Sequence, residues 1–175
     1  CRESGYEMSI YYLDRNSEDY QIQVDNLLMD TTAATVLLGG ELTDEECKDF
    51  KKASGPFLLL DYWNHDMSLD GVFINNSDAA RMAGEYLIKK GHRNIGYLRG
   101  DYRIKAFRSR SVGLQIALNK HNLQLNKENI VTLGVTMEDA YQDMLAYLKK
   151  KPGLPTAFFA DNDNLALGAM KALEE

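Results

Sequence analysis

The chain of 175 residues has few cysteines, few prolines and no long apolar run. Its two cysteines, Cys1 and Cys47, are too few for a disulfide framework, so we expect free thiols and a cytoplasmic location. Three prolines and thirteen glycines exclude collagen-like and proline-rich linker classes. A membrane helix needs roughly 20 consecutive apolar residues, and no run approaches that length. The sequence therefore predicts a globular protein with no membrane partner.

Clustered positive charge is also missing. The net charge is −6 and the isoelectric point is near 5.1. Nonspecific affinity for nucleic acid comes from grouped lysines and arginines, so we expect that this chain does not bind DNA by itself. Its 45% hydrophobic residues are enough to build one domain or two small lobes.

Short apolar runs alternate with amphipathic segments of about a dozen residues along the chain. Each amphipathic segment has helical spacing, and Thr43 with Glu46 forms a capping box. This alternation predicts an α/β fold with parallel sheets covered by helices on both faces. The expected strands are at 8–13, 35–38, 57–60, 72–75, 95–98, 130–133 and 156–160. A helix starting near Asn16 or Ser17 is expected between the first two strands.

One connection has no helical periodicity. Residues 61–71 join two strand-like runs without a helix, which indicates a chain passing from one lobe to another. We therefore expect two parallel α/β lobes, 1–75 and 76–175, with the boundary near Asn75. The chain opens without an initiator methionine and stops within a helical pattern, so we expect both ends to be cut and at least one element to be missing upstream.

Polar residues follow the predicted strands. In open parallel sheets, ligands bind beyond the carboxyl ends of the strands. Carboxylates, amides, a guanidinium and aromatic rings together suit a polyhydroxylated, sugar-like ligand. The groups at these ends are Gly39-Gly40, Asp61-Tyr62-Trp63, Asn75-Asn76, Arg99-Gly100-Asp101, Gly134 and Asp161-Asn162-Asp163.

Most of these residues also have an ordinary structural interpretation. Four of them, Asn75, Asn76, Asp161 and Asn162, fit helix N-caps equally well. The aromatic residues Tyr62 and Trp63 are either core residues or a stacking platform. Arg110, with Arg108 nearby, is either a ligand contact or part of a solvated basic face.

Signals for catalysis and for metal binding are weak. The sequence has no glycine-rich nucleotide loop and no G-x-S-x-G elbow, so we expect no enzyme activity and no cofactor. Asp161 and Asp163 could serve acid–base chemistry, but capping explains them more simply. The three histidines, His65, His92 and His121, lack paired ligand spacing, so no metal site is expected.

The segment 83–100, AGEYLIKKGHRNIGYLRG, carries a family resemblance. Further matches in the same order are LLLDYW at 58–63, Arg110 and Gly113 in Arg-x-x-Gly, and PTAFFADNDNLALGAMKAL at 155–173. Together they resemble LacI/GalR-family transcriptional regulators over nearly the whole chain. The resemblance implies a type I periplasmic-binding-protein-like core with two Rossmann-like lobes around an effector cleft, both of them incomplete here and the first lacking its first strand. It also implies a missing N-terminal helix-turn-helix domain that binds operator DNA.

The resemblance assigns roles to individual residues. Arg110 matches the family's effector-clamping arginine, and Asn162 with Asp163 resembles the pair that meets sugar hydroxyls. Asp61 resembles an acidic residue at the edge of the cleft, and Tyr62 occupies a position that is often aromatic.

Two positions depart from the family pattern. Val135 stands where an effector-stacking aromatic ring is frequent, so the usual stacking mode is in doubt. Asn75-Asn76 resembles an altered Asp-Asn at the crossover between lobes.

The sequence thus predicts the effector-sensing and dimerisation region of a bacterial regulator, with a sugar or sugar derivative as its effector. The expected partners are this small molecule, a second copy of the chain, and operator DNA through the missing domain only. A secreted sugar-binding protein of a transport system and an α/β enzyme are the alternatives, because fold alone does not separate these classes. An upstream helix-turn-helix pattern would favour the regulator, and an upstream leader peptide the transport protein.

Overall fold

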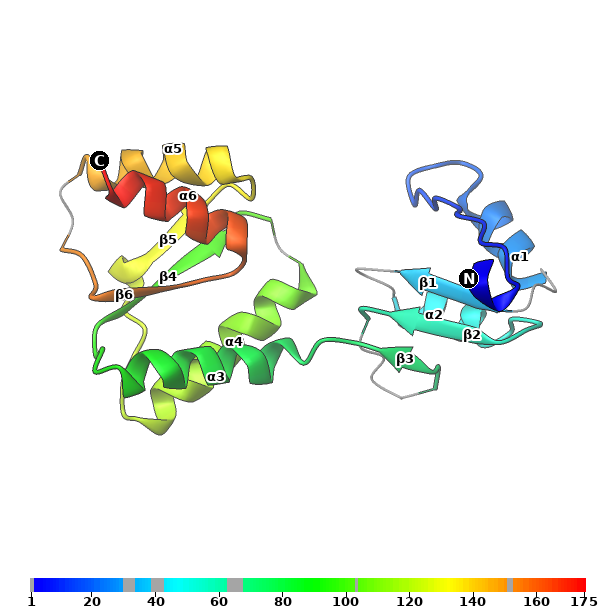
Figure 1. Ribbon diagram of the computed structural model, residues 1–175, viewed down its shortest axis with the longest axis horizontal. Coiled ribbons are helices and arrows are strands. Elements are labelled where there is room, and N and C mark those ends of the chain that lie inside the picture. The colour runs from blue at the N-terminus through cyan, green and yellow to red at the C-terminus, as the bar shows by residue number, and fades with distance from the viewer. Residues whose placement is uncertain (1, 30–33, 39–42, 63–67, 103, 151–152) are drawn as a thin grey trace. The chain divides into compact units, whose positions relative to one another are not determined.

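The computed structural model describes residues 2–29, 34–38, 43–62, 68–102, 104–150 and 153–175. The chain divides into two compact units, Cys1–Phe73 and Ile74–Glu175 (Figure 1). Each unit has its own three-stranded sheet, and every strand pair is parallel. Within the described residues, no helix combines the length and apolar character needed to cross a membrane.

The N-terminal unit is a small parallel sheet in the order β1-β2-β3. Val24, Leu28 and Phe50 form one buried cluster of this unit, and Cys47, Leu59 and Tyr62 form another. Its elements are the short 3₁₀ helix η1 (Arg2–Ser4), α1 (Tyr20–Met29), β1 (Thr35–Leu38), α2 (Asp44–Phe50), β2 (Phe57–Leu60) and β3 (Gly71–Val72).

The C-terminal unit is a sheet in the order β5-β4-β6 with a pair of helices on each face (Figure 1). Its elements are α3 (Asn76–Lys89), β4 (Ile95–Gly100), α4 (Lys105–Lys120), the 3₁₀ helix η2 (Lys127–Asn129), β5 (Ile130–Leu133), α5 (Met137–Leu148), β6 (Ala157–Ala160) and α6 (Asp163–Leu173). The predicted α/β class with parallel sheets is confirmed.

The central strand β4 supplies apolar residues to both faces of this sheet. Ile95 and Tyr97 pack with α3 and α4, whereas Leu98 packs with α5 and α6. Neighbouring side chains of a strand point to opposite faces, which explains the division. A strand that is buried on both sides is typically a continuous apolar run in the sequence, as residues 95–98 are.

Helices α3 and α4 pack closely, with glycine at their contact. A Cβ atom added to Gly113 would lie 2.0 Å from the carbonyl oxygen of Ser77 and 2.9 Å from the Cβ of Ala80. One added to Gly84 would lie 2.9 Å from the Cβ of Ala117. The backbone of α4 therefore rests directly on the first turns of α3.

Side-chain caps begin several helices where the sequence predicts them. Thr43 and Glu46 make the reciprocal contacts of a capping box at α2. The Thr136 hydroxyl accepts from the Asp139 amide at the start of α5. Gly91 follows the end of α3 with a φ of 99°, a left-handed conformation that glycine adopts without strain.

Three predicted boundaries are wrong. Residues 8–13 form no strand, and Met8, Ile10 and Tyr12 are 69%, 83% and 86% exposed. A strand needs a neighbour for its backbone groups, and in the described part of the chain the sheet consists of β1, β2 and β3 alone. Helix α1 begins at Tyr20 instead of near Asn16 or Ser17, because Asp14 and Ser17 accept from nearby amides in turns. The expected strand at 72–75 is only Gly71–Val72, since the chain then turns into the cap of α3.

Candidate functional site

The carboxyl ends of β4, β5 and β6 meet at one edge of the C-terminal sheet. Gly100 pairs with Leu133 at this edge, and Leu98 pairs with Ala160. The next residues extend the pairing, since the Asp101 amide donates to the Leu133 carbonyl at 2.9 Å. This edge is where ligands bind in parallel α/β folds.

Arg110 reaches this edge from the second turn of α4. Its Nε donates to Oδ1 of Asn76 at 2.8 Å, and its Nη1 donates to the backbone carbonyl of Asp161. Its guanidinium carbon lies 5.9 Å from the centre of the Phe107 ring. Arg110 is half-buried, whereas Arg108 on the same helix is exposed. The side chain of Arg110 is thus fixed by contacts, which argues against the interpretation as part of a solvated basic face.

Asp161 is a buried carboxylate that joins two strands. It is only 1% exposed. Its Oδ1 accepts from the Tyr97 hydroxyl at 2.6 Å, and its Oδ2 accepts from the Gly100 amide at 2.9 Å. Its own amide donates to the Leu98 carbonyl at 3.0 Å. These contacts replace the capping role that the sequence allowed for Asp161.

Burial raises the pKa of the Asp161 carboxyl above its ordinary value of 3.8. The hydrogen bonds from Tyr97 and Gly100 act in the opposite direction, as do the charges of Arg110 and Arg99. Burial and the bond to Asp161 also raise the pKa of the Tyr97 hydroxyl, which therefore remains a proton donor at neutral pH.

This shift predicts a pH dependence of stability. Between 3.8 and the raised pKa of Asp161, the folded chain holds a proton that the unfolded chain has released. The contribution of Asp161 to the unfolding free energy is therefore highest below this pH range and falls as the pH rises through it. We expect the difference in unfolding free energy, wild type minus Asp161→Asn, to decrease with rising pH in urea titrations from pH 3.5 to 7. A difference that grows with pH would show that the pKa of Asp161 is lowered in the folded state.

Asparagines cap the two helices that start near this edge. Oδ1 of Asn162 accepts from the Leu165 amide at 3.0 Å, and Oδ1 of Asn75 accepts from the Asp78 amide at 3.1 Å. Asp163, the first residue of α6, is exposed. Val135 is half-buried, and its carbonyl accepts from the side-chain amide of Asn164 at 3.4 Å.

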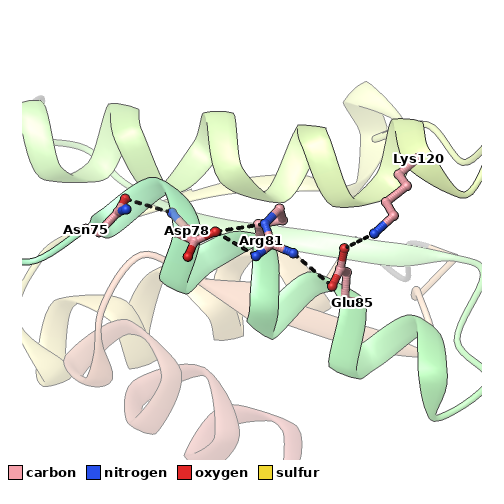
Figure 2. A network of polar contacts seen from close by, with 5 residues as sticks. All are labelled: Asn75, Asp78, Arg81, Glu85 and Lys120. Atoms are coloured by element: carbon pink, nitrogen blue, oxygen red, sulfur yellow. Dashed lines mark hydrogen bonds and ion pairs between the residues drawn. The ribbon is translucent and has the colours of Figure 1, made fainter.

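A polar network continues from Asn75 along the surface of α3 (Figure 2). Arg81 bonds to Asp78 at 2.6 Å and to Glu85 at 3.0 Å, and Glu85 also bonds to Lys120 of α4 at 2.9 Å. Solvent-accessible pairs of this kind contribute roughly 0 to 1 kcal/mol each. The network therefore supplements the close α3–α4 packing described above.

The two predicted site residues of the N-terminal unit follow β2. Asp61 is exposed and has a φ of 60°, a left-handed conformation that aspartate, like asparagine, adopts more often than most residues other than glycine. Tyr62 is buried with Cys47 and Leu59, which favours its interpretation as a core aromatic. Gly39, Gly40, Trp63 and His65 lie outside the described residues. No group of acidic, histidine or cysteine side chains in the described ranges could hold a metal ion.

Sequence reasoning missed two residues of this arrangement. Tyr97 and Phe107 were not singled out, although they contact Asp161 and Arg110. A tyrosine in a buried strand needs a partner for its hydroxyl, and this signal could have flagged Tyr97. For Asn76 the sequence left a cap and a ligand contact open, and in the structure its side chain accepts from Arg110.

The fold agrees with comparisons to known proteins. Residues 85–175 match the model of the periplasmic binding protein-like domain. Since the match covers more than half of the chain, the chain belongs to this family. The resemblance to LacI/GalR-family regulators is also confirmed by the relatives that follow.

The curated relatives are repressors of longer chain length. The HTH-type transcriptional repressor PurR of Actinobacillus pleuropneumoniae is 26% identical over 175 residues, which are all of this chain and 52% of the relative. This chain therefore spans about half the length of the curated relatives it matches.

Solved structures point to the same class. The Escherichia coli sugar-binding transcriptional regulator of the LacI family, complexed with phosphate, is 26% identical with a TM-score of 0.78, covering 91% of this chain and 58% of that one. The Escherichia coli transcriptional repressor ascG is 27% identical with a TM-score of 0.72, covering 88% and 55%.

Proposed function

We propose that the chain is the effector-binding and dimerisation region of a bacterial transcriptional regulator of the LacI type, with a sugar or sugar derivative as its effector. Such a regulator is a cytoplasmic homodimer and not an enzyme. It contacts operator DNA through a helix-turn-helix domain outside this chain. The relatives named as transcriptional repressors and LacI-family regulators support this class.

The observation that carries the proposal is the placement of Arg110. Its guanidinium is fixed by Asn76 and Asp161 at the carboxyl edge of the sheet. An arginine has five N–H donors in a planar fork. Two of them make these contacts within the described part of the chain, and the others can donate to a hydroxyl or an anionic group of an effector.

The neighbouring residues suit the same ligand. Asn162 and Asn75 cap helices through Oδ1, and within the described ranges of the chain their NH₂ groups remain available as donors. Asp163 is an exposed acceptor beside Asn162. Support for a sugar also comes from the related Escherichia coli regulator that is described as sugar-binding.

Three further residues complete the proposed site. Val135 gives apolar contact in place of a stacking ring. In the N-terminal unit we propose Asp61, which has an exposed carboxylate, and Tyr62, which packs with Cys47 and Leu59, as effector-binding residues. We also propose that the two compact units are the two lobes of such a region, divided near Asn75.

The mechanism requires no reaction chemistry. An effector that binds one conformational state more tightly than another shifts the population toward that state. In a dimer this shift changes how the DNA-binding domains are spaced, and hence their affinity for operator half-sites.

The test is a binding screen of this chain. Thermal unfolding is followed with D-glucose, D-galactose, D-ribose and their monophosphates. We expect at least one compound to stabilise the chain by about 2.7 kcal/mol at a concentration of about one hundred times its Kd. Chromatography should recover that compound unchanged.

Two outcomes would contradict the proposal. Conversion of a stabilising compound into a product would favour an enzyme. If no compound in the set stabilised the chain, the proposal of a sugar effector would be contradicted.

A further inference from the structure

We propose that Asp161 is a positioning residue, whose carboxylate joins the ends of β4 and β6 and thereby fixes the backbone carbonyl on which Arg110 is held. That Asp161 matters for effector binding rests on the function proposed above. That Asp161 orients Arg110 is independent of that function.

The surroundings of Asp161 require a carboxylate. Both donors that point at it come from β4, the hydroxyl of Tyr97 and the amide of Gly100. Burying a charge is costly unless its oxygens are hydrogen-bonded, and here each oxygen has a partner. An amide at this position would turn an NH₂ group toward one of the two donors, and an alanine would leave both donors unsatisfied.

The side-chain contacts fix the peptide group that follows. The Asp161 amide donates to Leu98 in the sheet, and the next residue, Asn162, caps α6. These two restraints lie on either side of the Asp161 carbonyl group and fix its orientation. Nη1 of Arg110 donates to this carbonyl oxygen. Arg110 is then held between this carbonyl and Asn76 at the start of α3.

This arrangement also keeps Arg110 available for a ligand. The Asp161 carboxylate attracts the guanidinium through its charge, and this attraction opposes the rise that burial causes in the pKa of Asp161. Its two oxygens, however, are bonded to Tyr97 and Gly100, and not to Arg110. A direct bidentate ion pair would instead occupy two N–H donors of the fork.

The chain offers a matched control in Asp143. Its Oδ2 accepts from the Gly134 amide at 2.9 Å, so it also bonds to a glycine just beyond a strand of the same edge. Asp143 lies on α5, which packs on the face of the sheet opposite α4. Its replacement removes a similar contact from a different strand.

The experiment measures the order parameter of the Arg110 Nε–H bond by ¹⁵N relaxation in the ligand-free chain. The resonance is identified by its loss in Arg110→Lys. We expect a value near about 0.85 in the wild type and in Asp143→Asn, and a value below about 0.6 in Asp161→Ala. Asp161→Asn and Tyr97→Phe, which each remove one contact, should give intermediate values and decide the question if Asp161→Ala fails to fold.

An order parameter in the Asp161 variants equal to that of the wild type would overturn the proposal. An equal drop in Asp143→Asn would also overturn it, because loosening anywhere at the edge would then have the same effect. Since no effector is present, a negative binding screen leaves this result unaffected. Conversely, failure here leaves the binding screen intact.

Discussion

Replacing Gly113 by alanine is expected to lower the unfolding free energy of the C-terminal unit by about 2 kcal/mol. The added Cβ would lie 2.0 Å from the Ser77 carbonyl oxygen, which belongs to the backbone of α3 and cannot rotate away. Overpacking typically costs about 1 to 3 kcal/mol, and a backbone obstacle places this site at the upper end. The better helix propensity of alanine returns only about 1 kcal/mol. Urea unfolding followed by circular dichroism measures the difference.

Gly153 provides the control for this substitution. A Cβ there meets nothing within 4 Å, so Gly153→Ala should change the unfolding free energy by less than about 1 kcal/mol. Equal stability of Gly113→Ala and the wild type would mean that α3 and α4 are farther apart than described. The Arg-x-x-Gly spacing of Arg110 and Gly113 would then lose its structural explanation.

Arg110→Ala is expected to weaken binding of the sugar identified in the screen by on the order of a hundredfold or more. Each charged hydrogen bond contributes roughly 1.5 to 3 kcal/mol, and the substitution removes at least two such donors. Arg110→Lys should rescue poorly, because an ammonium group lacks the planar fork. In an intact regulator, effector response should be lost while operator binding stays near normal. Isothermal titration measures the affinities.

Arg108→Ala is the matched control, since Arg108 is an exposed arginine on the same helix. Its affinity should stay within about threefold of the wild type. If Arg110→Ala, Arg110→Lys and the wild type also agree within about threefold, Arg110 is not a ligand contact, and the site carried over from the family resemblance loses its main support.

Local patterns in the sequence were sufficient for most of the secondary structure. The capping box at Thr43 and the cap at Thr136 depend on residues three apart, so they can be identified without the fold. The segment 8–13 shows the limit of this approach. Its apolar residues fit a strand, but a strand exists only where a neighbour completes its hydrogen bonds.

The candidate site depends on contacts that local patterns do not contain. Asp161 and Tyr97 are 64 residues apart, and Arg110 and Asn76 are 34 apart. The strand-end rule placed Asp161 at the correct edge of the C-terminal sheet, because parallel topology alone determines that edge. It did not place Asn76 there, since the strand before Asn76, β3, belongs to the sheet of the N-terminal unit. It could not assign their partners, since several polar residues at one edge compete for each donor. Of the four residues that fit either a cap or a ligand contact, Asn162 and Asn75 cap helices, whereas the side chains of Asp161 and Asn76 have other partners.

Hydrogen–deuterium exchange with and without the sugar found in the screen tests most directly whether this edge binds the effector. The account predicts slower exchange at 100–101, 134–136 and 161–165, where β4, β5 and β6 end and α5 and α6 begin. Slower exchange confined to the opposite ends of the same strands, at 93–95, 128–130 and 155–157, would contradict it.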